Sequence, residues 1–174
     1  GYLMLLAATQ AKLALDHGFT SVIGAATGDA LDAQLKMAIA DGVVPGPRIM
    51  ASGRWLITTG DSNDLPEFAS WKIQAKGAQR YCDGVDEFTK GVRQEIREGA
   101  EIIKIFMDGG HALLYGPEFV SMTEAELHAA VQATHDRQKL IRCHVTAKRG
   151  IMKCLDAGVD VFDHADRMDR ECID

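Results

Sequence analysis

The sequence lacks the features that mark nucleic-acid and nucleotide binding. It has no run of lysine and arginine residues, and its 19 basic and 25 acidic side chains give a formal net charge of −6. We therefore expect no nucleic-acid partner. The sequence also has neither a G-x-G-x-x-G segment nor a Walker loop after its first predicted strand, which argues against a nucleotide-binding open sheet.

Long hydrophobic runs and closely spaced cysteines are also missing. The apolar segment 2–15 is interrupted by Gln10 and Lys12 and is followed by Asp16, so we expect neither a membrane span nor a signal peptide there. The four cysteines form no C-x-x-C pair and lie at Cys82, Cys143, Cys154 and Cys172. In a chain of 174 residues this spacing is typical of reduced thiols, and we expect a cytoplasmic protein with no membrane partner.

Predicted strands and helices alternate along the chain. Strands are expected over 19–23, 48–52, around Lys104, and over 140–143 and 159–162, with 53–83 irregular. Helices are expected over 2–17, between Asp29 and Gly42, over 86–98, from Thr123, over 147–157 and from Met168. This alternation predicts an α/β protein with a parallel sheet, and the missing nucleotide loop favours a (β/α)8 barrel of the TIM type. A full barrel needs about 250 residues and eight units, so we interpret residues 1–174 as one partial barrel domain holding about five units, strands 2–6.

Local signals locate several helix ends. Gly18 and Gly158 are predicted to stop helices, because glycine readily adopts the left-handed backbone found after a last turn. Asp29 is a candidate N-cap of the second helix. Thr123 and Glu126 have the spacing of a capping box.

Lys104 is the first candidate for a functional residue. It lies within an apolar run that precedes Gly109 and Gly110, and a buried ammonium is costly unless its charge is used or removed. His144 and His164 end the next two predicted strands. Because the C-terminal ends of barrel strands meet at one mouth, we expect Lys104, His144 and His164 to lie side by side.

These residue types suit a metal site. Neutral imidazoles are good ligands for zinc and its neighbours in the first transition row. A lysine becomes a ligand only when its amine is deprotonated and carbamylated by CO₂, since the carbamate has two oxygens that can bridge two metals. Burial favours the neutral amine that this chemistry needs. The plainer alternatives are a lysine that reaches solvent and histidines that are merely hydrogen-bonded.

Five segments of the sequence together resemble the metal-dependent amidohydrolase superfamily, in particular its imidazolonepropionase-like and prolidase-like branch. The segments are GFTSV, AIADGVVPGPRIMASGR, DGVDEFTKGVRQEIREGAEIIKIFMDGG, MTEAELHAAVQATHDRQKLIRCH and GVDVFDHAD. The resemblance implies a (β/α)8 barrel with two divalent transition metal ions, most simply Zn²⁺. It implies that Lys104 is the carboxylated bridging ligand and that His144 and His164 bind the second metal.

The same resemblance implies a hydrolase that cleaves an amide-like C–N bond of a small molecule through a metal-activated hydroxide. The substrate could be a dipeptide, a cyclic amide, a urea or a carbamate. The family pattern also has an H-x-H on the first strand and an aspartate on the eighth, and this sequence has no H-x-H. We therefore expect residues 1–174 to hold only part of the metal centre.

Loop residues near the predicted strand ends are candidates to touch substrate. Relatives often carry a glycine-rich loop with a histidine after the third strand, where this sequence has Asp61 and Ser62. Asp61 stays a candidate substrate contact, as do His111 and Tyr115 in the loop after the Lys104 strand. Asp163 and Asp166 flank His164 and are candidates to orient it.

Two alternatives remain open. A Schiff-base aldolase-type barrel would also place a reactive lysine, here Lys104, on an inner strand. A non-catalytic barrel fragment would have no activity of its own. An open half-barrel exposes strand edges and apolar helix faces, which promote association, and we expect a homo-oligomer.

Overall fold

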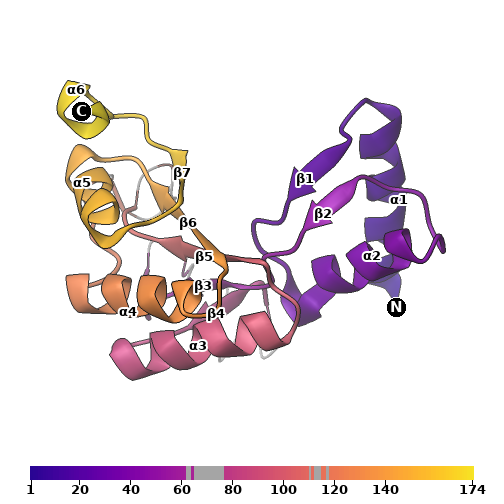
Figure 1. The fold of residues 1–174 in the computed structure, drawn as a ribbon, viewed down its shortest axis with the longest axis horizontal. Coiled ribbons are helices and arrows are strands. Elements are labelled where there is room, and N and C mark those ends of the chain that lie inside the picture. The colour runs from indigo at the N-terminus through magenta and orange to yellow at the C-terminus, as the bar shows by residue number, and fades with distance from the viewer. Residues whose placement is uncertain (62–63, 65–76, 110, 112–114, 117) are drawn as a thin grey trace.

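Figure 1 shows the protein as a computed structural model that describes residues 1–61, 64, 77–109, 111, 115–116 and 118–174. Its N-terminal part is a small parallel sheet with helices beside it. The strands are β1 (Ser21–Ile23) and β2 (Arg48–Met50), and the helices are α1 (Tyr2–Asp16) and α2 (Leu31–Ala40). Ala11, Leu35 and Ile49 form a small buried cluster where these elements meet.

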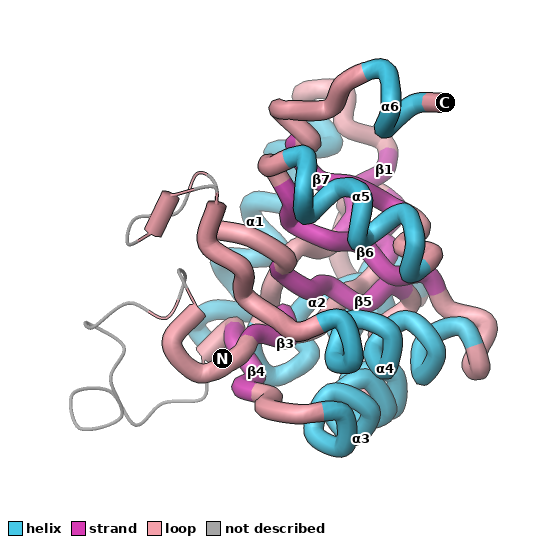
Figure 2. Tube along the Cα trace, turned by 90° about the vertical axis from the view of Figure 1, so that its left-hand side faces the viewer, coloured by secondary structure: helices cyan, strands magenta, loops and turns pink. Residues whose placement is uncertain are grey.

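A larger parallel sheet follows, with its strands in the order β4-β3-β5-β6-β7. The strands are β3 (Trp55–Ile57), β4 (Gln79–Tyr81), β5 (Ile102–Phe106), β6 (Leu140–Val145) and β7 (Val161–His164). The helices are α3 (Val85–Arg97), α4 (Glu124–His135), α5 (Lys148–Ala157) and α6 (Arg170–Ile173). Figure 2 shows α3, α4 and α5 side by side along this sheet. The α/β class predicted from the sequence is confirmed.

Several helix ends follow their local signals. Gly18 after α1 and Gly158 after α5 have φ values of +91° and +84°, the left-handed backbone expected of a glycine stop. At the start of α4, the Thr123 hydroxyl accepts the Glu126 N–H at 3.3 Å, and the Glu126 carboxylate accepts the Thr123 N–H at 2.7 Å. The predicted capping box is therefore confirmed.

The prediction that Asp29 caps α2 is wrong. Asp29 lies in a short 3₁₀ turn before the helix and has a left-handed φ of 52°, and the N-cap position of α2 is occupied by Ala30. Asp32, in the first turn of α2, accepts the N–H groups of Ser52 at 2.6 Å and of Gly53 at 3.1 Å. Its carboxylate therefore ties α2 to the chain that follows β2.

The segment 53–83, predicted to be irregular, contains the strands β3 and β4 in its described part. Each spans three residues, too few for an alternating pattern to be recognised. β2 and β3 follow each other closely along the chain but belong to different sheets. β2 pairs with β1, whereas β3 pairs with β4 and β5, so the chain bends between them. At the bend, the Ala51 carbonyl accepts the Glu101 N–H at 2.8 Å and Gly53 has a φ of +66°. This bend joins the small sheet to the large one.

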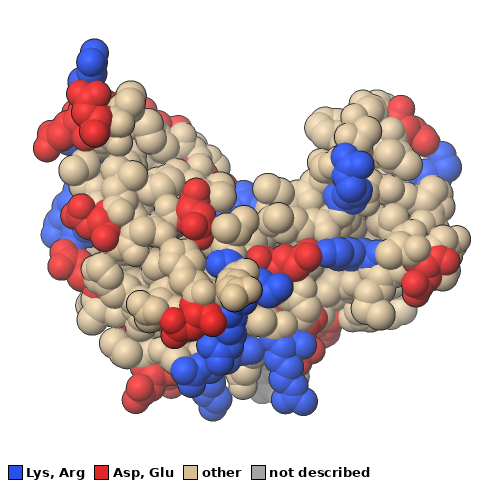
Figure 3. All heavy atoms as spheres, viewed as in Figure 1, with Lys and Arg blue, Asp and Glu red and all other residues tan. Residues whose placement is uncertain are grey.

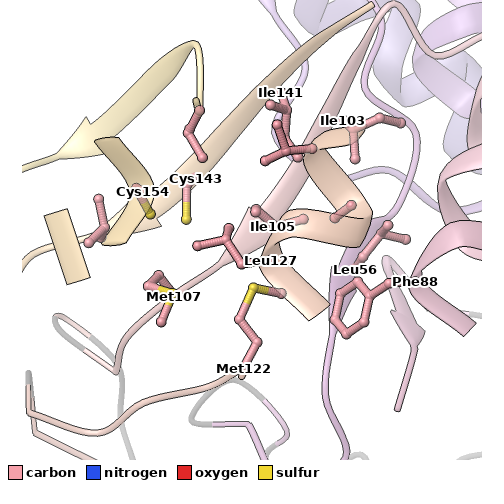
Figure 4. Close-up of a cluster of buried hydrophobic side chains, with 14 of the residues drawn as sticks. Leu56, Phe88, Ile103, Ile105, Met107, Met122, Leu127, Ile141, Cys143 and Cys154 are labelled. Atoms are coloured by element: carbon pink, nitrogen blue, oxygen red, sulfur yellow. The ribbon is translucent and has the colours of Figure 1, made fainter. Parts of the chain in front are cut away.

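One face of the large sheet forms the main core. Side chains of successive strand residues alternate between faces, and those that pack against the helices are apolar. Figure 4 shows part of this cluster, which includes Leu56, Phe88, Ile103, Ile105, Met107, Met122, Leu127, Ile141, Cys143 and Cys154. Burial of these side chains holds the helices on the outside of the sheet.

The other face carries polar and aromatic side chains. Lys104 pairs in register with Arg142, Phe106 with His144, and His144 with Asp163, so all five point to the same side. In a closed barrel this inner face lines the interior. Figure 3 shows the molecule hollowed between the part built on β1, β2 and α1 and the part built on β7, α5 and α6. Within the described ranges, no helix has both the length and the apolar character needed to cross a membrane.

Candidate functional site

Three imidazole rings gather near the C-terminal ends of β5, β6 and β7. The ring centroid of His144, in β6, lies 4.7 Å from that of His164, at the end of β7. His111, from the loop after β5, has its ring centroid 4.7 Å from that of His164 and 6.3 Å from that of His144. The structure therefore brings together two predicted metal ligands and one predicted substrate contact.

His164 reaches this cluster through an unusual backbone. It pairs in register with Val145, which points into the main core, so a regular strand would turn the imidazole away from the inner face. His164 instead has a φ of +75°, and Ala165 a φ of +51°. Such residues cost about 1–3 kcal/mol each and collect at functional sites, so the strain supports a functional role for His164.

Lys104 is buried on the inner face, with 4% of its surface exposed, and forms an ion pair with Asp163 of β7. Burial lowers the pKa of the Lys104 amine below its ordinary value and outweighs the opposing effect of Asp163. Its Nζ lies 4.8 Å from the ring centroid of Phe106. A lowered pKa suits both carbamylation and Schiff-base formation, because each begins from the neutral amine.

Asp163, a candidate to orient His164, is held by two cations instead. Arg142 donates from Nε to Asp163 Oδ2 at 3.1 Å and from Nη2 to Oδ1 at 2.6 Å, and Lys104 also binds Oδ2. Burial disfavours the charged carboxylate, but these hydrogen bonds outweigh it and hold the pKa of Asp163 below its ordinary value. Asp166, the other candidate, lies within hydrogen-bonding distance of Nε2 of His111.

The remaining predicted loop contacts lie in different surroundings. Tyr115 is 46% exposed and its ring stacks on that of Phe119, with the centroids 4.4 Å apart. Asp61 is fully buried, and its carboxylate accepts the hydroxyl hydrogen of Ser121. Ser62 and Gly110 lie outside the described residues. The roles of Tyr115 and Asp61 as substrate contacts stay predictions.

Asp108 is a site residue that the sequence argument missed. Its carboxylate is 2% exposed and accepts the backbone N–H groups of Thr146 and Ala147, each at 2.8 Å. Its Oδ1 also accepts the Thr146 hydroxyl at 3.0 Å and lies 3.9 Å from Nε2 of His144. Asp108 therefore links the end of β5 to the turn that begins α5. An acid two residues after a buried strand is the signal that could have identified it.

Phe106 and Trp55 are a second feature that the sequence argument missed. The Phe106 ring stacks on His144, with centroids 4.8 Å apart and planes at 20°. Trp55, from the neighbouring strand β3, meets Phe106 edge-on at 5.0 Å and 82°. Because strand side chains alternate between faces, the two-residue spacing of Lys104 and Phe106 could have predicted that both point to the same face of the sheet.

The donor chemistry of the inner face fits a transition metal. Clustered imidazoles are suitable ligands, and the buried amine of Lys104 could add oxygens after carbamylation. Among the residues that the structure describes, no group of three His, Cys, Asp or Glu side chains is arranged as a complete metal site.

Comparisons with known proteins agree with this architecture. The model of the amidohydrolase family matches residues 2–173. Ochratoxinase from Aspergillus niger is 29% identical to this chain over 172 residues, which is 91% of this chain and 35% of the ochratoxinase. The chain therefore spans about a third of the length of the curated relatives it matches.

Solved structures give the same result. The crystal structure of A. niger ochratoxinase superposes with a TM-score of 0.85 at 29% identity, covering 95% of this chain and 41% of that one. A Xaa-Pro dipeptidase with methionine bound in its active site has a TM-score of 0.84 at 28% identity, covering 98% and 43%. A prolidase complexed with N-methylphosphonate-L-proline has a TM-score of 0.80 at 31% identity, covering 91% and 40%. The family model matches almost the whole of this chain, and the chain has the fold of part of a TIM-type barrel. The chain therefore belongs to the amidohydrolase family.

Proposed function

We propose that this chain is part of a metal-dependent hydrolase that cleaves amide-like C–N bonds in small molecules. The observation that carries the proposal is the pairing of His144 and His164 at neighbouring strand ends, with ring centroids 4.7 Å apart. Lys104 is buried on the same sheet. The names of the relatives add support, since an ochratoxinase and a Xaa-Pro dipeptidase are among them.

Lys104, His144 and His164 would hold divalent transition metal ions, most simply Zn²⁺. Metal bound there would lower the pKa of a water and polarise the carbonyl under attack. The amine of Lys104 would first add to CO₂, forming an N–C bond and releasing one proton, and the resulting carbamate would offer two oxygens. The lowered pKa of Lys104 favours this step, because only the neutral amine carries the lone pair that attacks CO₂.

The charges around Lys104 allow such a change. Carbamylation replaces a cation by an anion, and the Lys104 ammonium would then no longer partner Asp163. Arg142 keeps two hydrogen bonds to the Asp163 carboxylate, so this carboxylate would stay paired.

Substrate contacts would come from the loop after β5. The His111 side chain is about half exposed and lies against His164, so it can donate a hydrogen bond to a carbonyl or carboxylate of the substrate. Tyr115 is exposed in the same loop and could contribute a hydroxyl group. Asp61 is buried and would reach substrate only if its surroundings opened.

Location and assembly are part of the proposal. The protein would be cytoplasmic, would act on a small molecule and would form a homo-oligomer. Exposed apolar side chains on α1 support association, with Tyr2 77%, Leu3 65% and Leu5 71% exposed.

The proposal is tested on the complete parent protein by elemental analysis. We expect about two transition metal ions per chain, and loss of metal and of amide hydrolysis in His144→Ala and His164→Ala. His128→Ala is the matched control, because His128 is exposed on α4, and it should keep both. Hydrolysis by a metal-free protein would refute the proposal. Borohydride trapping of substrate on Lys104 would support the Schiff-base alternative.

A further inference from the structure

Phe106 lies at the centre of the inner face, between the groups that the proposed metal site needs. Its ring stacks on the His144 imidazole, with centroids 4.8 Å apart and planes at 20°. The Nζ of Lys104 lies 4.8 Å from the same ring centroid. The side chain is only 5% exposed, so its position is set by packing. Phe106 therefore contacts two of the three residues proposed to hold metal.

Trp55 supports Phe106 from the neighbouring strand. Leu56 lies in register with Ile105, so Trp55 and Phe106 point to the same face of the sheet, and their rings meet edge-on at 5.0 Å and 82°. The indole Nε1 of Trp55 is buried and has no hydrogen-bond partner within the described structure. A buried, unpaired N–H costs free energy. Trp55 therefore supports Phe106 through contact between the two rings, and its N–H group adds no hydrogen bond.

The His144 ring is thereby restrained from more than one direction. Phe106 covers one face of the imidazole, the His164 ring approaches at 69°, and Asp108 Oδ1 lies 3.9 Å from Nε2. An imidazole binds metal through a lone pair in the ring plane, so rotation of the ring points that lone pair away from the metal. Groups that fix the orientation of a ligating histidine are therefore part of a working metal site.

We propose that Phe106, supported by Trp55, is a positioning residue that fixes the plane of the His144 imidazole for metal binding. This inference rests on the proposed metal-dependent function. An aliphatic side chain at 106 could fill the same space but would offer no flat surface for the imidazole. The role of Phe106 can therefore be separated from simple core packing.

The test compares Phe106→Leu with Phe88→Leu in the complete parent protein, using Co²⁺ as the probe. Both phenylalanines are buried, but Phe88 packs on the helix side of the sheet. We expect Phe106→Leu to weaken Co²⁺ binding about 10- to 100-fold and to change the visible absorption spectrum of the bound ion. Phe88→Leu should lower thermal stability while leaving the Co²⁺ affinity and spectrum unchanged. Phe106→Tyr keeps the flat ring and should restore the affinity.

A second pair of variants covers the case in which Phe106→Leu does not fold. Trp55→Leu removes the supporting ring and should weaken Co²⁺ binding, whereas Trp55→Phe keeps an aromatic edge and should bind nearly as well as the wild type. Equal Co²⁺ affinity and spectra in wild type, Phe106→Leu and Trp55→Leu would overturn the inference. So would an equal loss of affinity in Phe88→Leu.

Failure of the inference and failure of the proposed function give different results. A ring-current shift of the His144 Cε1–H resonance reports the stack without metal, and Phe106→Leu should abolish it. A shifted resonance in a wild-type protein that binds no Co²⁺ would refute the metal-dependent function and the inference with it. Tight Co²⁺ binding that does not depend on Phe106 would refute the inference alone.

Discussion

The guanidinium of Arg142 in β6 binds the carboxylate of Asp163 in β7 through two hydrogen bonds, of 3.1 and 2.6 Å. The third nitrogen, Nη1, donates to the Gly24 carbonyl at 2.9 Å. Gly24 directly follows β1, 118 residues away along the chain. One side chain on the inner face therefore connects β6, β7 and the end of the small sheet.

Removal of this guanidinium should destabilise the protein strongly. Arg142→Met keeps an apolar stem but leaves Asp163 with Lys104 as its remaining cation, so we expect a loss of about 3 kcal/mol in the free energy of unfolding. The double variant Arg142→Met, Asp163→Asn should lose more, because it leaves the buried Lys104 ammonium without a carboxylate partner. Urea unfolding measures both. An unchanged midpoint in the single variant would show that the ion pair does not stabilise the fold.

Asp163 should make stability depend on pH in the acid range. Its pKa in the folded protein lies below the ordinary value of 3.8, so the unfolded chain takes up the proton first as the pH falls. The stabilisation is therefore complete above the ordinary pKa and is lost as the pH falls from there through the lowered pKa. Asp163→Asn should lose less free energy of unfolding than the wild type between about pH 5 and about pH 3.

The control for the pH experiment is Asp156→Asn, since Asp156 is exposed on α5. This variant should follow the wild type through the same pH range, measured by urea titration at each pH. Identical pH profiles for Asp163→Asn and the wild type would contradict the role given to Asp163.

Asp108 should matter both for stability and for the candidate metal site. Asp108→Asn removes the charge that accepts two backbone N–H groups at the start of α5, so we expect a loss of about 2 kcal/mol in the free energy of unfolding. Metal affinity should fall about tenfold as His144 loses its carboxylate neighbour.

Thr146→Val is the matched comparison for Asp108→Asn. It removes only the hydroxyl that donates to Asp108 and should cost about 1 kcal/mol, with metal affinity retained. Calorimetric titration with Zn²⁺ and thermal unfolding separate the two effects. The interpretation fails if Asp108→Asn and Thr146→Val behave alike in both measurements.

The left-handed backbone at Ala165 should be relieved by glycine. Ala165 has a φ of +51°, so Ala165→Gly should raise the free energy of unfolding by about 0.5 kcal/mol, after allowing for the lost methyl group. Ala157→Gly, near the C-terminal end of α5, should instead lower it by up to about 1 kcal/mol. Thermal unfolding of the two variants gives the signs, and destabilisation by Ala165→Gly would argue against strain at this position.

The elements that could be predicted are those with strong local patterns. The capping box of Thr123 and Glu126 and the glycine stops at Gly18 and Gly158 act within a few residues, so they can be recognised along the chain. The strands β3 and β4 could not be recognised, because three residues carry too little pattern. Asp29 was mistaken for a cap because composition does not reveal its left-handed backbone.

The candidate site divides in the same way. The sequence by itself determined the alternation of strands and helices, the place of Lys104 inside a buried strand and the places of His144 and His164 near strand ends, because side-chain periodicity and helix signals are local. Only the tertiary structure decided that Asp163 forms ion pairs with Lys104 and Arg142 and that Phe106 stacks on His144. These contacts depend on the register between strands, which is set by the packing of residues far apart in the chain.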